Sequence, residues 1–181
     1  MDARAEKTLR EQPGVRSRPS IRVREARSAD VSSMVELLGY LFKQEADFGP
    51  SPAKQRRALE LILAQPFLGR LFVLSRGKKV LGMVSLLFTI STAEGGKAAW
   101  LEDLVVRPDH RGHGLGTRLL RGAVAWARKE GITRITLLTD ADNVGARGLY
   151  LRHGFSASAM QPLRLHLAHR SDVRPATLTM V

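Results

Sequence analysis

The chain has 181 residues and carries 29 Lys and Arg against 17 Asp and Glu, which gives a formal net charge of +12. This length fits one domain, and an apolar share of 44% excludes wholesale disorder and a fibrous repeat. Because the chain has no cysteine, it has no disulfide, no thiolate metal site and no Cys nucleophile.

Charge and turn residues divide the chain into three parts. Residues 1–20 are rich in Arg, contain Pro13, Gly14 and Pro19, and show little apolar periodicity, so we expect a disordered basic N-terminal extension. Residues 21–168 have the patterns of a folded domain, and residues 169–181 those of a C-terminal tail. The longest apolar stretch, near residues 80–90, is too short and too interrupted to span a membrane, and the N-terminus lacks the apolar core of a secretory signal. We therefore expect a cytoplasmic protein with no membrane partner.

The first half of the domain predicts strands and helices in a clear order. Residues 21–26 alternate as a half-buried strand, and Ser28 with Asp30 is an N-cap signal for an amphipathic helix from Val31 to Phe42. After the break at 49–52, a second helix is expected over 53–64. Strands over 71–75, 79–90 and 98–106 follow, separated by turns at 76–78 and 92–97.

The second half alternates helix and strand. The spacing predicts a helix over 114–130, closed by Gly131, a strand over 132–139, and a short helix over 144–153 capped by Asp142 or Asn143. A closing pair of strands is expected from Phe155 onward and over 163–167. This order predicts a mixed α/β domain in which antiparallel hairpins lead into a βαβ unit.

Residues 105–117 run from the end of a strand through a glycine-rich turn into a helix. Glycine allows close backbone approach and positive φ, and the first amides of a helix have no internal acceptors, so the turn has the properties of a phosphate site. Arg111 adds positive charge at its entrance. The turn lacks the third glycine of a dinucleotide-binding fingerprint and the Gly-Lys-Ser/Thr of a nucleoside triphosphate loop.

The turn instead matches the Arg-x-x-Gly-x-Gly signature of the GNAT superfamily of N-acetyltransferases, here Arg111 to Gly116. Upstream, Leu101-Glu102-Asp103-Leu104-Val105-Val106 resembles the fourth strand of that family. Downstream, the family's Asn-x-x-Ala-x-x-x-Tyr-x-x-x-Gly-Phe pattern is matched by Asn143, Ala146, Tyr150, Gly154 and Phe155. The resemblance covers roughly residues 100–155, and the element order extends it to 21–167.

The resemblance implies an α/β (α+β) fold with a mixed, mostly antiparallel central sheet of six to seven strands flanked by about four helices. It also implies direct transfer of the acetyl group of acetyl-CoA to a primary amine, in a ternary complex, with no metal. The acceptor is a small molecule or a protein. Because dimers are common in the family, a homodimer is one expected state.

The resemblance further assigns roles to individual residues. The backbone of Leu104, Val105 and Val106 would pair with the pantetheine arm, and Asn143 would bond to the pantetheine or to adjacent backbone. Tyr150 would be the general acid beside the sulfur, with ring packing as the alternative. Glu102 would be a general base acting through water, or a carboxylate that binds the substrate ammonium. The pyrophosphate would be held by Arg111, Gly112, His113, Gly114, Leu115, Gly116 and Thr117.

Three further features bear on these roles. Asp103 must point away from Glu102 unless a bulge intervenes. The loop with Glu45 and Asp47 borders the acceptor site in the family, and these carboxylates either attract a cationic amine or are simply solvated. His110 and His113 have no third ligand nearby, so we interpret them as surface residues rather than a metal site.

The basic surplus also clusters inside the domain, between Arg107 and Arg134, where we expect it to face the phosphates of coenzyme A, including the 3′-phosphate. The alternative is a basic nucleic-acid-binding or regulatory module on a GNAT-like scaffold without catalysis. An aromatic content of 6% and the lack of any standard DNA- or RNA-binding signature argue against nucleic acid.

Overall fold

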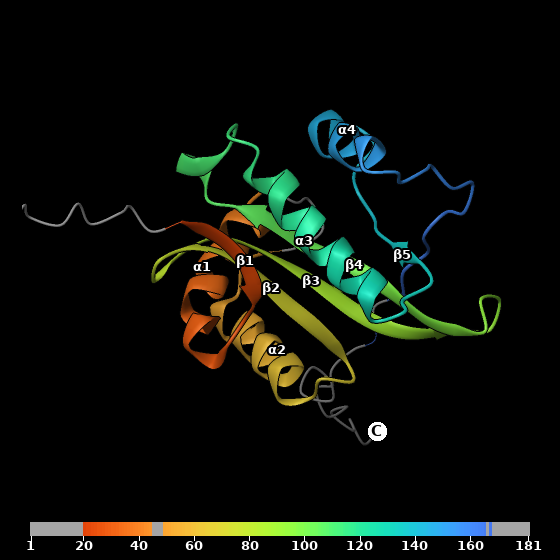
Figure 1. The fold of residues 1–181 in the computed structure, drawn as a ribbon, viewed down its shortest axis with the longest axis horizontal. Helices are drawn as coiled ribbons and strands as arrows, with labels where there is room; N and C mark the ends of the chain where they lie inside the picture. Colours follow the sequence, from red (N-terminus) through yellow and green to blue (C-terminus); the bar gives the residue numbers. More distant parts are fainter. Residues whose placement is uncertain (1–19, 45–48, 166, 168–181) are drawn as a thin grey trace, which may run out of the picture.

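A computed structural model describes residues 20–44, 49–165 and 167. Its centre is a sheet of five strands whose spatial order is the same as their order in the chain. The four antiparallel strands are β1 (Ile21–Glu25), β2 (Gly69–Arg76), β3 (Lys79–Ser91) and β4 (Gly96–Val106), and β5 (Ile135–Thr136) lies parallel to β4 at the edge (Figure 1).

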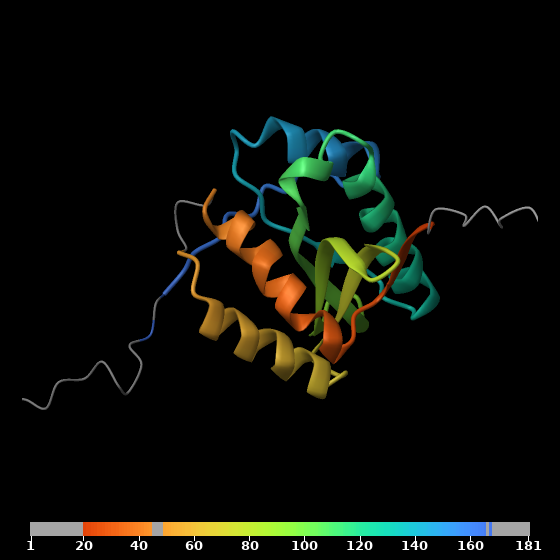
Figure 2. The same ribbon diagram turned by 90° about the vertical axis from the view of Figure 1, so that its left-hand side faces the viewer.

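Helices cover both faces of this sheet. Helices α1 (Val31–Phe42) and α2 (Pro52–Ala64) lie on one face and α3 (Leu115–Lys129) on the other, and Figure 2 shows the sheet between these two layers. Helix α4 (Val144–Arg152) lies beyond the N-terminal end of α3, near the β4 edge (Figure 1). Two short 3₁₀ turns, η1 (Ser28–Asp30) and η2 (Pro108–His110), precede α1 and α3. Each face of the sheet has its own buried apolar cluster.

Helix α3 forms where the apolar period predicts it. Its inward stripe is fully buried and comprises Leu115, Leu119, Leu120, Ala123 and Ala127. The opposite face is basic, which is the amphipathic pattern of a helix packed on a sheet. Gly131, at φ 70°, ends the helix in the left-handed conformation that glycine adopts without strain.

The turn before α1 is fixed by a buried carboxylate. Asp30 accepts a hydrogen bond from the backbone amide of Arg27 at 2.8 Å and two from the guanidinium of Arg24 at 2.7 and 2.9 Å. Asp30 occupies the N-cap position of α1, but its side chain makes no cap hydrogen bond to that helix, so the cap predicted from Ser28 and Asp30 is not formed. The carboxylate instead closes the η1 turn and ties it to Arg24 of β1.

Among the described residues the sheet has five strands, whereas six to seven were expected. The strand expected over 132–139 is only two residues long, because its backbone pairs with β4 only at Ala99 and Trp100, although Ile135 and Leu137 both pack against the α3-side cluster. The closing pair expected from Phe155 and over 163–167 is absent from residues 155–165 and 167. Met160, Leu163, Leu165 and Leu167 are all more than four-fifths exposed, since no described strand lies beside them.

The other predicted elements are present, with boundaries shifted by a few residues, which confirms the mixed α/β class and the four helices. None of the described helices is long and apolar enough to cross a membrane. The proposed N-terminal extension and C-terminal tail fall almost entirely outside the described residues.

Candidate active site

A β-bulge lies in β4 at Asp103. On the neighbouring strand Met83 pairs with Val105 but Ser85 pairs with Glu102, so two residues of β4 oppose the single residue Val84. Asp103 has φ 54°, a left-handed conformation that Asp tolerates better than most residues. The bulge shifts the side-chain alternation of β4 by one position. The intervening bulge that would allow Asp103 and Glu102 to share a face is therefore present.

Both carboxylates of this pair lie on the α1/α2 face. Ser85 is buried on that face next to Met83, and Glu102 lies directly opposite Ser85 in the register, so its side chain projects to the same side. The Ser85 hydroxyl donates to Oδ2 of Asp103 at 3.0 Å. Burial raises the pKa of Glu102, and the like charge of Asp103 raises it further. Burial also raises the pKa of Asp103, against the Ser85 hydrogen bond, which lowers it.

The C-terminal half of β4 has an open edge. Strand β5 pairs with β4 only at Ala99 and Trp100, so no described residue forms a ladder with this edge from Leu101 to Val106. The Val106 carbonyl accepts a hydrogen bond from Nε of Arg111 at 3.1 Å, and Val106 is thus already engaged at the end of the strand. Leu104 and Val105 are the two expected pantetheine-binding residues whose backbone lies along the open edge.

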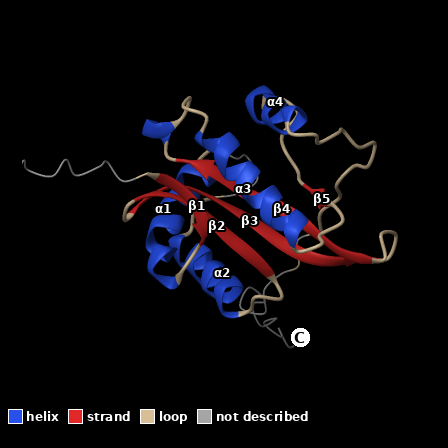
Figure 3. Cartoon of the chain, viewed as in Figure 1, coloured by secondary structure: helices blue, strands red, loops and turns tan. Residues whose placement is uncertain are grey.

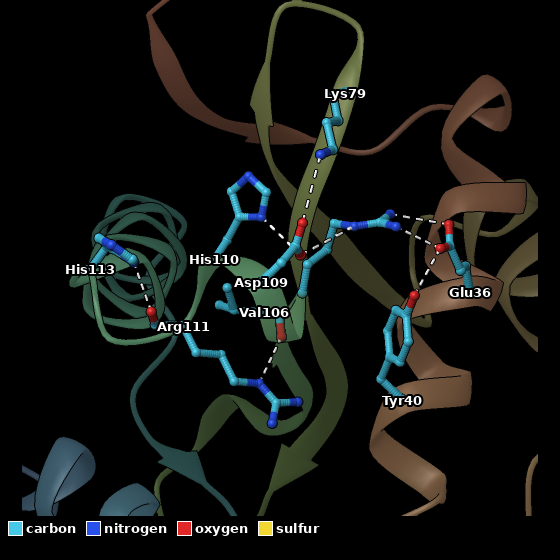
Figure 4. A network of polar contacts seen from close by, with 9 residues as sticks. Glu36, Tyr40, Lys79, Val106, Asp109, His110, Arg111 and His113 are labelled. Atoms are coloured by element: carbon cyan, nitrogen blue, oxygen red, sulfur yellow. Dashed lines mark hydrogen bonds and ion pairs between the residues drawn. The ribbon is translucent and has the colours of Figure 1, made fainter.

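The glycine turn leads directly into α3. Gly112 and Gly114 have φ values of 78° and 70°, and the first intrahelical hydrogen bond is donated by the Arg118 amide to Gly114 at 3.1 Å. The preceding amides of Leu115, Gly116 and Thr117 have no acceptor within the helix, and the helix dipole makes this end favourable for an anion. Here His113 Nδ1 contacts the Arg111 carbonyl at 2.7 Å, so its ring lies against the turn (Figure 4).

The three sequence motifs meet at Gly116. A Cβ built on this glycine would lie 3.8 Å from Leu149 of α4 and 4.0 Å from both Leu104 and Val106 of β4. The turn, the open strand edge and α4 therefore border one region, although Leu104 and Leu149 are 45 positions apart in the sequence.

Helix α4 carries the two downstream motif residues in different roles. Asn143 caps the helix, because its Oδ1 accepts a hydrogen bond from the Ala146 amide at 3.1 Å. Tyr150 is half-buried in the cluster on the α3 side and packs edge-on against Phe155, with ring centroids 5.6 Å apart. No described residue bonds to its hydroxyl, and burial raises its pKa, so the phenol is protonated at neutral pH. Tyr150 and Glu102 thus belong to opposite faces of β4.

An ion-pair network at the end of β4 was not anticipated from the sequence. Arg107 binds Glu36 of α1 through two hydrogen bonds, and the Tyr40 hydroxyl donates to Glu36 at 3.0 Å (Figure 4). On its other side Arg107 lies 3.9 Å from Asp109, and Nδ1 of His110 lies 2.9 Å from the same carboxylate. Arg107 is therefore neutralised locally rather than free to face phosphates.

The rest of the basic surplus is distributed unevenly. Arg134 pairs with Glu94 at 3.4 Å, whereas Arg118, Arg121 and Arg128 line a hollow of about 800 Å³ along the outer side of α3. Gly114 and Thr117 of the turn form part of the same hollow. Of these three, only Arg118 lies on the first turn of α3 beside the glycine turn, where it donates a hydrogen bond to the Ile21 carbonyl, and Arg121 and Arg128 lie further along the helix.

Two further features considered in the sequence concern a metal site and the acceptor site. These residues contain no group of three or more His, Asp or Glu side chains that could hold a metal ion. Glu45 and Asp47, which either attract a cationic amine or are simply solvated, lie outside the described residues, so neither alternative is tested.

Comparisons with known proteins identify the family of this chain. A sequence model of the acetyltransferase (GNAT) family matches residues 38–155, and the chain belongs to this family. The aminoalkylphosphonate N-acetyltransferase of Salmonella typhimurium is 29% identical over 140 residues, which cover 77% of this chain and 88% of that protein. N-acetyltransferase 8F1 of Rattus norvegicus is 33% identical over 97 residues, but these cover 54% of this chain and only 44% of the rat protein.

Solved structures show the same fold. An integron cassette protein from the mobile metagenome of the Cole Harbour salt marsh superposes with a TM-score of 0.71 and 29% identity, over 81% of this chain and 91% of that chain. A predicted acetyltransferase from Clostridium acetobutylicum, solved with acetyl-CoA, superposes with a TM-score of 0.66 and 19% identity, over 81% and 96% of the two chains.

Proposed function

We propose that the chain is an N-acetyltransferase that transfers the acetyl group of acetyl-CoA to a primary amine of its acceptor, directly and within a ternary complex. The observation that carries this proposal is the meeting of three features at Gly116. These are the open edge of β4, the free amides at the start of α3, and the Tyr150-bearing helix α4. Membership of the GNAT family and a fold neighbour solved with acetyl-CoA support it.

The residues present fit the co-substrate. An extended amide-containing arm can add to the open edge of β4 as a further strand would, at Leu104 and Val105. The pyrophosphate suits the amides of residues 112–117, where two left-handed glycines keep the backbone free of side chains. Arg118 supplies positive charge beside the turn for the remaining phosphate, and Arg121 and Arg128 extend the positive potential along α3. Because Asn143 caps α4, we assign it to the adjacent backbone rather than to direct contact with the arm.

Acetyl-CoA supplies an acetyl thioester, whose C–S bond breaks as the C–N bond to the amine forms. Glu102 accepts the proton that the amine must lose, directly or through one water, and its raised pKa brings it closer to the working pH than an ordinary Glu. The protonated Tyr150 hydroxyl donates a proton to the departing sulfur. Since the two residues flank β4 from opposite faces, the amine and the sulfur would approach the open edge from opposite sides.

Binding can be tested by calorimetry with a matched pair of variants. Gly114→Ala and Gly131→Ala both place a Cβ on a residue with φ 70°, at opposite ends of α3 and with no atom within 4 Å. Both should cost about 1 kcal/mol of stability. Only Gly114→Ala should weaken acetyl-CoA binding, by roughly tenfold or more, because only that end borders the phosphate site. Failure of the unmodified chain to bind acetyl-CoA would overturn the proposal.

The acceptor can be sought in a screen that detects release of the thiol. The panel should include the acceptors in the names of relatives, an aminoalkylphosphonate, streptothricin and L-methionine sulfoximine, together with polyamines and lysine peptides. Glu102→Gln should reduce turnover with any accepted amine by about 10²-fold or more if the carboxylate is the base. An effect on the acceptor KM alone would instead assign Glu102 to binding the substrate ammonium.

A further inference from the structure

The partly buried carboxylate of Asp103 has no role in the chemistry described so far, although the bulge brings it to the same face as Glu102. The Ser85 hydroxyl donates to it at 3.0 Å, and Glu102 is the residue directly before it in β4 and directly opposite Ser85 in the register. Without the bulge Asp103 would project to the α3 side, away from Glu102.

We infer that Asp103, carried onto the α1/α2 face by the bulge and held there by Ser85, is a positioning residue that sets the protonation state of Glu102. This inference rests on the proposed role of Glu102 as general base. An ionised carboxylate beside a second carboxyl group makes removal of the second proton less favourable. Asp103 therefore makes Glu102 a stronger proton acceptor without itself touching the reacting atoms.

Ser85 is the residue that makes this arrangement work. A buried carboxylate without a donor tends to take up a proton and become neutral, and a neutral Asp103 would exert no like-charge effect on its neighbour. Burial raises the pKa of Asp103, and the hydrogen bond from the Ser85 hydroxyl opposes this rise by stabilising the ionised form. The charge that acts on Glu102 thus depends on a hydroxyl group on the neighbouring strand.

Two further charged groups on this face are engaged with partners other than the carboxylate pair. Helix α1 presents Glu36, whose carboxylate is bound by Arg107, and α2 presents Arg56, which pairs with Glu60 on its own helix. Within the described part of the chain, Asp103 is the one charged group that shifts the pKa of Glu102. A change at Asp103 should therefore be seen directly in the titration of Glu102.

The test compares the unmodified enzyme with Asp103→Asn, Ser85→Ala and the control Ser91→Ala. Asparagine also tolerates positive φ, so the bulge should persist in Asp103→Asn. Ser91 is a buried serine of the same strand that bonds to Glu94 and Arg134, far from the carboxylate pair. The pH dependence of kcat/KM with an accepted amine is measured for each variant, and the carboxyl of Glu102 is titrated by NMR with ¹³C-labelled Glu.

Asp103→Asn should move the acidic limb of the pH profile of kcat/KM to lower pH. The fraction of activity retained on the acidic limb should rise by roughly threefold or more, while the maximum value of kcat/KM should fall. Ser85→Ala should move it in the same direction by less, and Ser91→Ala should leave it unchanged. The NMR titration of Glu102 should shift to lower pH in the first two variants.

A Glu102 titration that is identical in the unmodified protein and in Asp103→Asn would overturn the inference. This readout does not depend on catalysis, so the two proposals fail separately. If Glu102→Gln remained fully active, the assignment of Glu102 as the general base would be wrong. Asp103 would then have no catalytic role, even if the titrations of the two carboxylates were coupled.

Discussion

The guanidinium of Arg107 is held by both carboxylate oxygens of Glu36, with Nη2 2.6 Å from Oε1 and Nη1 3.1 Å from Oε2 (Figure 4). The pair joins α1, on the face that carries Glu102, to the residue that follows β4 and leads into the glycine turn. The Arg107 side chain is mostly buried and also lies over the Tyr40 ring, so it is oriented from two sides. One ion pair thus fixes the spacing between the proposed acceptor side and the proposed phosphate side.

Replacing Glu36 by Gln should lower the free energy of unfolding by about 0.5–1 kcal/mol, because the carboxylate is half-exposed and its attraction to Arg107 is screened by solvent. The loss should shrink at high salt. Urea unfolding at low and high NaCl measures it. Glu60→Gln, which breaks the longer 3.9 Å pair to Arg56, is the control and should change stability less. A loss for Glu36→Gln that is the same at both salt concentrations would contradict an electrostatic origin.

The contact between α3 and β1 leaves no room for a methyl group at Gly122. A Cβ there would lie 2.7 Å from Cγ1 of Val23, a branched side chain with little freedom to turn away. Gly122→Ala should therefore destabilise the fold by about 1–3 kcal/mol. At Gly39 of α1 nothing lies within 4 Å of the added Cβ, so Gly39→Ala should stabilise by roughly 0.5–1 kcal/mol through helix propensity. Thermal unfolding measures the expected loss of stability in Gly122→Ala and the expected gain in Gly39→Ala.

The Arg24–Asp30 pair should make stability depend on pH. The hydrogen bonds from Arg24, and that from the Arg27 amide, lower the pKa of Asp30 below its ordinary value of 3.8. A carboxylate with a depressed pKa contributes stability above its unfolded-state value, and that contribution is lost as the pH falls through the folded-state value. Asp30→Asn should therefore cost about 1.5–3 kcal/mol at neutral pH. The difference from the unmodified protein should narrow below pH 3.8, and a constant difference down to pH 2 would contradict this origin.

Tyr150→Phe should separate proton donation from packing. Phenylalanine retains the edge-on contact with Phe155, so stability and acetyl-CoA affinity should change little, whereas turnover should fall by about 10²-fold if the hydroxyl is the acid. Because burial raises the pKa of Tyr150 above its ordinary value of 10.0, its loss of activity by deprotonation should begin only at strongly alkaline pH. A weakened acetyl-CoA affinity with unchanged turnover would make Tyr150 a binding residue.

Features that depend on local pattern could be predicted from the sequence. The apolar stripe of α3, the glycine turn before it and the hairpin strands β2 to β4 all follow from the residues within each segment. The bulge at Asp103 could not be predicted, because it is set by how β4 registers against Met83 and Ser85 on another strand. The Arg107–Glu36 pair joins residues 71 positions apart. The alternating leucines at 163–167 misled the prediction, since a period of two does not provide a neighbouring strand.

The two-residue pairing of β5 determines which part of the sheet opens most easily. Strands β2, β3 and β4 are joined by short turns, so they can assemble in sequence with little loss of chain entropy. Strand β5 reaches β4 only after the α3 crossover, and few backbone hydrogen bonds hold it there, among them Ala99 to Arg134 and Thr133 to Lys97 at 2.9 Å each. Amide hydrogen exchange should therefore be fastest in this part of the sheet. The least protected strand is the one that borders the open edge of β4, so local opening there would widen the way in for a ligand while the hairpins stay folded.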